Sequence, residues 1–242
     1  MFVHYRTLGF VLKKEDKGEQ DHLFTVFTKE FGKLKILGKS IRKLKSKLRS
    51  SIQPFYLVEI EFIQGKSYKT LTDAIRIERF KKIEKDLDKL KIAGEIAEIS
   101  DNFIKGEEPD KKIGNLILET FKRLNGCVFQ LNFIVFYYFL WNFFSILGYC
   151  PEINECVLCQ KKLLPKNLYF SSEQGGIICE KCFKKTKKRK KISPETIKIL
   201  RIFLKKNWKI LSKLKIKEEN KKELNEFSEN YLAFLYNTLD IS

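Results

Sequence analysis

Histidine is scarce in this sequence of 242 residues, which contains only His4 and His22. Both fall in segments that alternate as strands do, and we interpret them as structural side chains. Three enzyme motifs are absent as well: the GxxxxGK(S/T) phosphate loop, the HExxH zinc-protease motif and the Gly-x-Ser-x-Gly nucleophile motif. Glu59 and Glu61 alternate on one strand face, as solvated carboxylates do. We therefore expect no catalytic residue and no enzymatic activity.

The N-terminus lacks the apolar core of a secretory signal, because Met1–Leu12 alternates apolar and polar residues. We therefore expect a cytoplasmic protein whose thiols stay reduced. In such a compartment, paired cysteines bind a metal more often than they form disulfides.

Acidic residues are too few to balance the basic ones. Lys and Arg number 48 against 30 Asp and Glu, which gives a formal net charge of +18. The excess is clustered: between Lys29 and Arg49 nine basic residues stand against Glu30 alone, and between Lys184 and Lys191 seven of eight residues are basic. Genome composition or a hot habitat explains scattered lysines. Two dense clusters favour a polyanionic partner, either a nucleic acid or an anionic membrane surface.

Four of the six cysteines form two Cys-x-x-Cys pairs, Cys156/Cys159 and Cys179/Cys182, with 19 residues between the pairs. This gap lies within the range of about 15–20 residues expected for a four-thiolate zinc site. The alternatives are two disulfides or a redox dithiol, and a redox motif commonly occurs alone. Four thiolates complete a tetrahedron around zinc and leave no position for water, so we predict a structural Zn²⁺.

Three neighbouring features bear on this site. Gly175-Gly176 precedes the second pair, and we expect it to supply a positive-φ turn for the zinc knuckle. Cys127 and Cys150 lie outside the pairs. Cys150 is a candidate competing ligand, although we interpret it as a buried apolar thiol.

One apolar run is long enough to span a bilayer. No charged residue occurs between Arg123 and Glu152, and Val128–Leu147 is almost wholly apolar. Polar amides interrupt the run, however, and aromatic residues fill its centre. We therefore predict a helix buried in the middle of a helical domain, with no membrane partner. The alternative is a membrane-associated protein anchored by this segment.

The N-terminal third alternates with a period of two residues, which predicts strands. The expected strands are Val3–Lys13, His22–Thr28, Lys33–Leu37, Phe55–Ile63 and Tyr68–Ile77, with turns at Lys14–Gln20, Phe31-Gly32 and Gly65. Five short strands with a basic connection between the third and the fourth indicate a small barrel, and we predict an OB-fold. Periodicity leaves an SH3-like barrel open as the alternative.

From Ile83 the apolar residues recur at helical spacing. The residues expected to face inward are Leu87, Leu90, Ile92, Ala93, Ile96, Ala97 and Ile99 in one helix, Ile113, Leu116, Ile117 and Phe121 in the next, Ile197, Leu200, Leu204, Trp208 and Leu211 in a helix capped at Ser193-Pro194, and Leu224, Phe227, Tyr231 and Phe234 in the last. The predicted fold class is therefore α+β. The expected domains are an OB-fold DNA-binding barrel (1–80), a helical domain (81–150), a zinc knuckle (151–183) and C-terminal helices that pack on the helical domain (184–242).

Several short motifs occur in a specific order along the chain. They are Glu19-Gln20-Asp21-His22-Leu23, Phe27-Thr28, Gly32-Lys33, Gly38-Lys39, Gln53-Pro54-Phe55, Lys69-Thr70-Leu71, Gly148-Tyr149, Pro151, the paired cysteines and Gly175-Gly176. In residue type and spacing they resemble the zinc-bearing branch of the RecO family of bacterial recombination mediators. The resemblance covers most of the chain, and beyond Lys191 it is reduced to a helical pattern.

The resemblance implies a non-enzymatic mediator of DNA repair and homologous recombination in the RecF pathway, cytoplasmic and associated with the nucleoid. Such proteins bind single- and double-stranded DNA, anneal complementary strands and, with RecR, help to load RecA onto DNA coated by the single-stranded DNA-binding protein SSB. In some relatives the acidic C-terminal tail of SSB docks on the helical domain. Here Tyr137 and Tyr138 stand where an arginine pair is expected, and Lys122 and Arg123 are the candidate substitutes.

A curved barrel face lined with cations suits the phosphates of a DNA strand and predicts a steep salt dependence with little sequence preference. The predicted DNA-binding residues are Lys33, Lys35, Lys39, Arg42, Lys43, Lys47 and Arg49. Further candidates are Phe31, for base stacking, and Lys187, Lys188 and Arg189 in the second basic run. A surface that screens two strands at once lowers the repulsion between them, which suits annealing.

Other interpretations stay open at this point. The basic cluster can be a solvated loop. The protein can also be another zinc-ribbon nucleic-acid-binding protein that acts on RNA or in transcription, or a nuclease with an unrecognised site.

Overall fold

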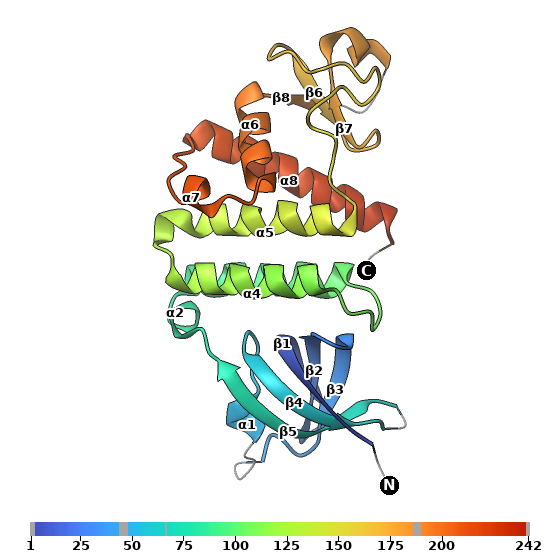
Figure 1. Ribbon diagram of the computed structural model, residues 1–242, viewed down its shortest axis with the longest axis vertical. Helices are drawn as coiled ribbons and strands as arrows, with labels where there is room; N and C mark the ends of the chain where they lie inside the picture. Colours follow the sequence, from blue (N-terminus) through green and yellow to red (C-terminus); the bar gives the residue numbers. More distant parts are fainter. Residues whose placement is uncertain (1–2, 44–47, 66, 186–189, 241–242) are drawn as a thin grey trace. The chain divides into compact units, whose positions relative to one another are not determined.

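The computed structural model describes residues 3–43, 48–65, 67–185 and 190–240. The chain forms two compact units, Met1–Phe139 and Leu140–Ser242. The first unit holds a β-barrel and the helices that pack on it. The second holds the cysteine-bearing module and the last helices (Figure 1).

The first unit begins with a closed barrel whose strands follow the order β1-β2-β3-β5-β4. β3 and β5 pair in parallel, and the other neighbouring strands are antiparallel. This five-stranded arrangement is that of an OB-fold, so the predicted α+β fold with an N-terminal OB barrel is confirmed. The elements are β1 (His4–Lys17), β2 (Asp21–Thr28), β3 (Gly32–Gly38), the short helix α1 (Leu48–Ser51), β4 (Leu57–Ile63) and β5 (Lys69–Glu78).

β1 continues through charged residues that were expected to form a turn, and it ends at Lys17. Its length follows from two successive partners, β4 along its first half and β2 along its second. A register shift between Val11 and Lys13 bends the strand from one partner to the other. The turn itself covers only Gly18–Gln20, so the predicted turn at Lys14–Gln20 is too long.

Apolar side chains from all strands fill the barrel. The buried core residues are Val11, Phe24, Val26, Leu34, Ile36, Ile41, Ile52, Tyr56, Val58, Ile60, Phe62, Leu71 and Ala74. Phe31 is half-buried against this core, with its ring centroid 5.7 Å from that of Tyr5 and 5.6 Å from that of Phe62. Its ring therefore helps to close one end of the barrel.

Helices α2 (Lys81–Glu84), α3 (Leu87–Phe103) and α4 (Lys111–Gly126) follow the barrel, and Figure 1 shows α4 beyond one end of the strands. The loop after α3 lies so close to the start of β3 that a Cβ on Gly32 would be 2.4 Å from the carbonyl oxygen of Glu108. Phe27 of β2 packs against Gly114 of α4. These contacts cover one end of the outer face of β2 and β3.

Two leucines of α3 that were expected to face inward lie at the surface instead. Leu87 is 85% exposed and Leu90 is 37% exposed, whereas Lys89 is buried. Lys89 Nζ donates to the carbonyl oxygen of Cys127 at 2.7 Å, so the aliphatic stem packs while the ammonium group keeps a hydrogen bond. The buried face of α3 thus begins at Lys89, which a search for apolar residues at helical spacing does not identify.

α5 (Asn132–Leu147) follows a short 3-10 turn, η1 (Phe129–Leu131). The segment Phe129–Leu147 has the length and composition of a membrane span, but 61% of its apolar window is buried inside the protein. Phe139, Phe143 and Phe144 are completely buried. Packing within the protein therefore accounts for the charge-free run.

The second unit combines a small sheet with helices. Its strands, in the order β7-β6-β8, are β6 (Leu168–Ser171), β7 (Gly176–Ile178) and β8 (Lys190–Ile192), with the 3-10 helix η2 (Glu180–Lys185) after β7. The helices are α6 (Pro194–Leu204), α7 (Trp208–Leu211) and α8 (Glu218–Thr238). Trp141 of α5 stacks on Phe227 and Tyr231 of α8, with ring centroids 5.3 and 5.9 Å apart. The last helix thus buries its aromatic face.

One predicted helix is divided in the structure. The pattern from Ile197 to Leu211 suggested a single helical face, but α6 ends at Leu204 and α7 is a separate turn. Lys206 lies between them with φ +55°, a left-handed conformation that interrupts a helix. The predicted cap is confirmed, since the backbone N–H of Thr196 donates to Ser193 Oγ at 3.2 Å.

Candidate metal centre and nucleic-acid surfaces

The four paired cysteines converge on one point. The Sγ atoms of Cys156, Cys159, Cys179 and Cys182 all lie within 4.8 Å of one another, and those of Cys159 and Cys179 are 3.9 Å apart. Zn–S bonds of about 2.3 Å place tetrahedral sulfur ligands about 3.8 Å apart. The spacing therefore fits one tetrahedral metal ion.

Backbone hydrogen bonds shape the loop that carries the first pair. Cys156 donates from its N–H to the carbonyl oxygen of Lys161 at 2.9 Å, and Gln160 donates to the carbonyl oxygen of Cys156 at 2.7 Å. Gln160 has φ +57°, so the positive-φ residue of this knuckle is a glutamine. The loop folds back tightly enough to aim both sulfurs in one direction.

Gly175-Gly176 lies elsewhere than predicted. Gly175, at φ +68°, belongs to the turn between β6 and β7 and not to a cysteine knuckle. A Cβ on Gly176 would be 2.6 Å from the carbonyl oxygen of Glu152. This close approach lets Ile177 donate to the same carbonyl oxygen at 2.8 Å. The glycines therefore join the two halves of the cysteine module.

The cysteine sulfurs differ in how readily they ionise. Burial opposes ionisation of Cys156, but backbone N–H groups of Cys179, Cys159 and Leu158 donate to its sulfur and lower the pKa of Cys156 to about 6. Burial and the neighbouring sulfurs raise the pKa of Cys182 to about 12. One thiolate forms easily and its charge then opposes the others, a conflict that a bound cation removes. The donor set thus fits a divalent metal ion.

The two remaining cysteines do not join the cluster. Cys150 has its sulfur 3.7 Å from the carbonyl oxygen of Pro151, and Cys127 has its sulfur 3.4 Å from the carbonyl oxygen of Leu124. Burial raises the pKa of both thiols. Cys150 therefore keeps the character of a half-buried neutral thiol.

The basic residues between Lys29 and Arg49 do not share one surface. Lys33 donates to the backbone carbonyl oxygen of Asp101, and its Nζ lies 3.1 Å from Asp101 Oδ1, with 17% of the side chain exposed. Lys35, two residues further along β3, is exposed. Lys33 is covered and Lys35 is not because α3 and the loop after it contact only the start of β3.

Lys35 borders a hollow of about 410 Å³ that we call the outer hollow. Its lining residues are Lys33, Lys35, Gln64, Ser67, Tyr68, Lys69, Gly106 and Glu107. Glu107 neutralises Lys69 at 2.5 Å. Lys17 Nζ lies 5.4 Å from the ring centroid of Tyr68, which brings the β1–β2 turn and the β4–β5 loop together. These two loops and the β2–β3 face are where OB-folds bind nucleic acids.

A second hollow, of about 470 Å³, is lined by Lys14, His22, Arg42, Arg49 and Gln53, and we call it the inner hollow. Lys14 is paired in register with Phe24, a residue of the barrel core, whereas Lys35 is paired with Thr25. Successive residues of a strand point to opposite faces. The inner and outer hollows therefore lie on opposite faces of the sheet formed by β1, β2 and β3.

Charged groups crowd the inner hollow. Lys14 Nζ donates to Gln53 Oε1 at 2.9 Å, and the Asp16 carboxylate lies 2.9 Å from His22 Nδ1 and 3.3 Å from Arg42 Nη1. Burial lowers the pKa of His22, and the nearby Lys14 and Arg42 lower it further. Asp16 opposes this shift, so the lowered pKa follows first from burial.

The remaining predicted DNA-binding residues fall in two groups. Lys39 and Lys43 are exposed on the segment after β3 that also carries Arg42, and neither lines the inner hollow. Lys47 and the run Lys187, Lys188 and Arg189 lie outside the described residues. Lys14, Lys17 and His22 were not predicted to bind DNA: the two lysines fell in the predicted turn at Lys14–Gln20, and His22 was interpreted as a structural side chain. The run of charged residues in the β1–β2 hairpin was the sequence feature that could have indicated these residues.

Lys122 and Arg123 of α4, the candidate binding residues for the SSB tail, already interact with carboxylates. They line a hollow of about 450 Å³ together with Asn115 and Leu118. Arg123 Nε donates to Glu119 at 3.0 Å, Tyr138 OH donates to the same carboxylate at 3.1 Å, and Lys122 pairs with Glu78 at 3.4 Å. Burial and Glu119 raise the pKa of Tyr138 to about 12.

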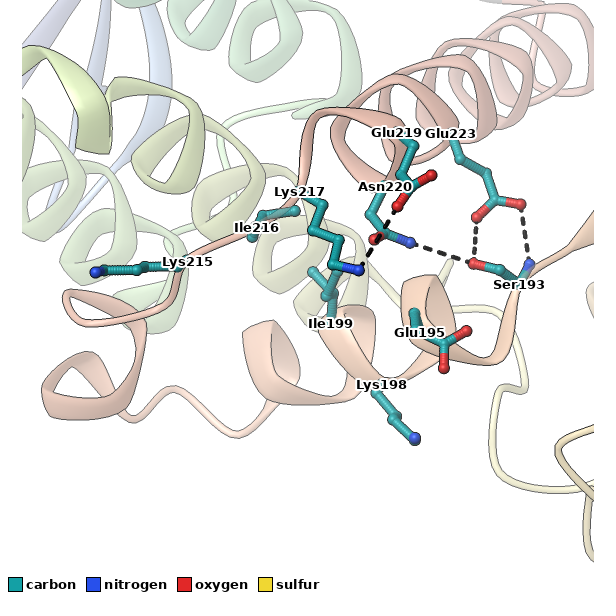
Figure 2. A pocket seen from close by; sticks show the side chains of 10 residues that line it. All are labelled: Ser193, Glu195, Lys198, Ile199, Lys215, Ile216, Lys217, Glu219, Asn220 and Glu223. Carbon is teal, nitrogen blue, oxygen red and sulfur yellow. Dashed lines mark hydrogen bonds and ion pairs between the residues drawn. The ribbon is translucent and has the colours of Figure 1, made fainter.

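Figure 2 shows a further hollow, of about 780 Å³, at the beginnings of α6 and α8. Glu223 accepts hydrogen bonds from Ser193 N at 2.9 Å and from Ser193 Oγ at 2.5 Å. Its carboxylate therefore occupies the helix N-terminus where an external anion would bind. The three lysines of the lining, Lys198, Lys215 and Lys217, are matched by three glutamates. The hollow has the arrangement of a structural cap.

Two sequence profiles of known families match the chain. "Recombination protein O N terminal" matches residues 1–80, which hold the barrel, and "Recombination protein O C terminal" matches residues 84–238.

Three similar relatives are each named DNA repair protein RecO. The protein from Thermoanaerobacter sp. (strain X514) is 30% identical over 240 residues, 97% of this chain and 95% of the relative. The proteins from Bacillus velezensis (strain DSM 23117 / BGSC 10A6 / LMG 26770 / FZB42) and Bacillus subtilis (strain 168) are 32% and 30% identical over 225 residues, 92% of this chain and 86% of each relative. With the whole fold matched in this way, the chain belongs to the RecO family of DNA repair proteins.

Proposed function

We propose that this protein is a mediator of DNA repair and homologous recombination that binds single- and double-stranded DNA and anneals complementary strands. The observation that carries the proposal is the presence of cationic hollows on both faces of the β1–β2–β3 sheet. In the part of the chain that the structure describes, neither Lys35 nor Arg49 has a carboxylate partner. Such cations release counterions from phosphates and so favour DNA.

The outer hollow is the proposed path for a single strand. Lys35 offers a charge on the β3 face, and Lys17 and Tyr68 stand together at its rim. Tyr68 is half-buried, so its ring is held in place and still presents a face on which a base can stack. Phe31 packs inside the barrel end, and its role in stacking stays a prediction.

The proposed annealing depends on positive charge on both faces of the β1–β2–β3 sheet. Two strands repel each other over a Debye length of about 10 Å at 0.1 M salt. A single layer of sheet that carries cations on both sides places positive charge between strands bound at the two hollows. The protein would thereby lower their repulsion without any covalent step, in keeping with a role that is not enzymatic.

Zn²⁺ is the proposed resident ion of the cysteine module. Cys156, Cys159, Cys179 and Cys182 supply four soft ligands at tetrahedral spacing. With four thiolates there is no open position for water, so the ion supplies structure to the module. Lys187, Lys188 and Arg189 follow this module in the sequence, and we retain them as a proposed extension of the DNA surface.

Family membership supports an interaction with other recombination proteins, and we propose RecR as a partner. We further propose that the protein acts in the RecF pathway, where it helps to load RecA onto SSB-coated DNA. We also propose a cytoplasmic, nucleoid-associated location. The SSB tail would meet Lys122 and Arg123 beside the apolar Leu118. Because Glu78 and Glu119 already engage these cations, an acidic tail has to displace them, and we expect weak tail binding at this hollow.

The test is oligonucleotide binding by the double variant Lys17→Gln, Lys35→Gln, with Lys213→Gln, an exposed lysine of the second unit, as the matched control. Each lost phosphate contact should reduce the slope of log affinity against log salt by about one. We expect a tenfold or greater loss for the double variant, and none for the control. Equal affinities would remove the outer hollow from the DNA path. A strong preference of the wild type for RNA of the same sequence would favour the alternative, an RNA-binding or transcriptional zinc-ribbon protein.

A further inference from the structure

The inner hollow is lined by side chains from several elements of the barrel. Lys14 comes from β1, His22 from β2, Arg42 from the loop after β3, and Arg49 and Gln53 from α1 and the residues that follow it. Side chains from separate elements therefore converge on one space. Cations that converge from several elements on one small space suit a compact anionic group, such as the phosphate at the end of a strand.

The charges around the hollow also favour one kind of phosphate. Among the residues that the structure describes, Lys14, Arg42 and Arg49 are the cations of the hollow and Asp16 is the carboxylate that contacts this group, which leaves two positive charges when His22 is neutral. A phosphodiester within a strand carries one negative charge. A terminal phosphomonoester carries between about 1.5 and 2 negative charges at pH 7, and this value matches the excess.

The donors fit a phosphate group. Arg42 and Arg49 present planar guanidinium groups, which bind phosphate oxygens through paired hydrogen bonds. Gln53 holds Lys14 by the 2.9 Å hydrogen bond to its Nζ. Arg42 is shared with Asp16 at 3.3 Å, a contact loose enough for a second anion to compete. Gln53 Nε2 donates to the backbone carbonyl oxygen of Arg49 at 2.6 Å, whereas in the described part of the chain the Arg49 guanidinium group makes no hydrogen bond or ion pair.

We propose that the inner hollow is a binding site for the terminal phosphomonoester of a DNA strand, held by Lys14, Arg42 and Arg49. The inference rests on the proposed DNA binding and deepens it: the protein distinguishes phosphorylated strand ends from hydroxyl ends. Internal phosphates pass over the outer hollow on the other face of the sheet.

Binding of one labelled oligonucleotide with a 5′-hydroxyl, a 5′-phosphate or a 3′-phosphate end tests the proposal. We expect a phosphorylated end to improve affinity about tenfold, the scale of charge-assisted hydrogen bonds. Arg49→Gln and, separately, Lys14→Gln should reduce this ratio to near one. Lys35→Gln, on the opposite face, should weaken all three ligands alike and keep the ratio. Thermal unfolding of each variant shows that it is folded.

Two outcomes of this experiment overturn the inference while DNA binding stands: equal affinities of the wild type for all ends, or a preference that survives in both inner-hollow variants. Failure of the wild type to bind any oligonucleotide would instead overturn the proposed function.

A second measurement is independent of strand binding. The chain has two histidines, and only His22 lines the hollow, whereas His4 pairs with Glu61 on another part of the barrel. We expect thymidine 5′-monophosphate to shift the imidazole NMR signals of His22 and to leave those of His4 in place, with thymidine shifting neither. If His22 does not respond to the nucleotide, or responds equally to thymidine, the site does not bind a terminal phosphate.

Discussion

Lys33 and Asp101 tie the barrel to α3: Lys33 Nζ lies 3.1 Å from Asp101 Oδ1 and also donates to the backbone carbonyl oxygen of the same residue. Both side chains are mostly withdrawn from solvent. Lys33 therefore has a partly buried intramolecular partner, although the neighbouring basic residues Lys29 and Lys35 are exposed. We therefore expect Lys33 to contribute to stability and the exposed Lys35 to contribute to DNA affinity, although both belong to the same basic cluster in the sequence.

Lys33→Gln is expected to lower the free energy of unfolding by about 1.5–3 kcal/mol, because hydrogen bonds to a charged group are lost in a half-buried place. Its effect on DNA affinity should be small. Lys35→Gln should show the reverse, unchanged stability and weaker binding. Urea denaturation and fluorescence anisotropy measure the two quantities, and a parallel loss of affinity in both variants would assign Lys33 to the DNA surface.

Replacement of Cys156 and Cys159 by Ser is expected to abolish a stoichiometric zinc content and to lower the unfolding temperature. Metal binding to such a site is coupled to folding, so losing the ligands loses that free energy. Cys150→Ser, a change outside the cluster, should keep the metal. Elemental analysis of purified protein provides the measurement, and full zinc content in the double variant would be fatal to the site.

Tyr68→Ala is expected to weaken single-stranded DNA binding by about 1–3 kcal/mol, the usual value of one base stacked on an aromatic ring. Tyr68→Phe keeps the ring and should bind as the wild type does. Double-stranded DNA, whose bases are already stacked, should be affected less. Titrations with both forms of DNA decide the matter, and identical binding by the alanine and phenylalanine variants would rule out stacking.

Acid stability should depend on the contact between Arg79 and Glu84. Arg79 donates hydrogen bonds of 2.9, 2.9 and 2.6 Å to this carboxylate, and they lower the pKa of Glu84 from its ordinary value of 4.5. The unfolded chain then takes up the proton first as pH falls. The stabilisation is complete above about pH 4.5 and disappears as pH falls through the lowered pKa.

The corresponding measurement is urea denaturation of the wild type and Glu84→Gln between pH 7 and pH 3. The variant should be less stable at pH 7 and should lose less stability on acidification, because it has no carboxylate to protonate. Parallel pH profiles for the two proteins would show that the contact is not formed in solution.

Features with a local cause were predictable from the sequence. The cysteine spacing is set by one tight loop and one short turn, the cap at Ser193 by its own side chain, and the strands by alternation. Lys33 could not be assigned in this way, because its partner Asp101 is 68 positions away. The length of β1 likewise depends on its distant partner β4.

The arrangement of the cations was beyond sequence reasoning for a similar reason. Lys35 and Arg49 belong to one dense cluster in the chain, yet they line different hollows. Lys35 points to one face of β3 because of the strand register, whereas Arg49 belongs to helix α1, whose place against the barrel depends on tertiary packing. The division into four domains also stays a prediction, since the two compact units meet at Phe139 and Leu140 within α5.

The cysteine module is an excursion between two helices, leaving α5 at Leu147 and returning to α6 at Pro194. An ion that joins Cys156 to Cys182 acts as a cross-link inside this excursion and lowers the conformational entropy of the segment when it is unfolded. Metal starvation would therefore loosen the path into α6 and leave the barrel, which contains none of the four ligands, intact. A cell short of the ion would retain a folded barrel, while the cysteine module would lose its internal cross-link.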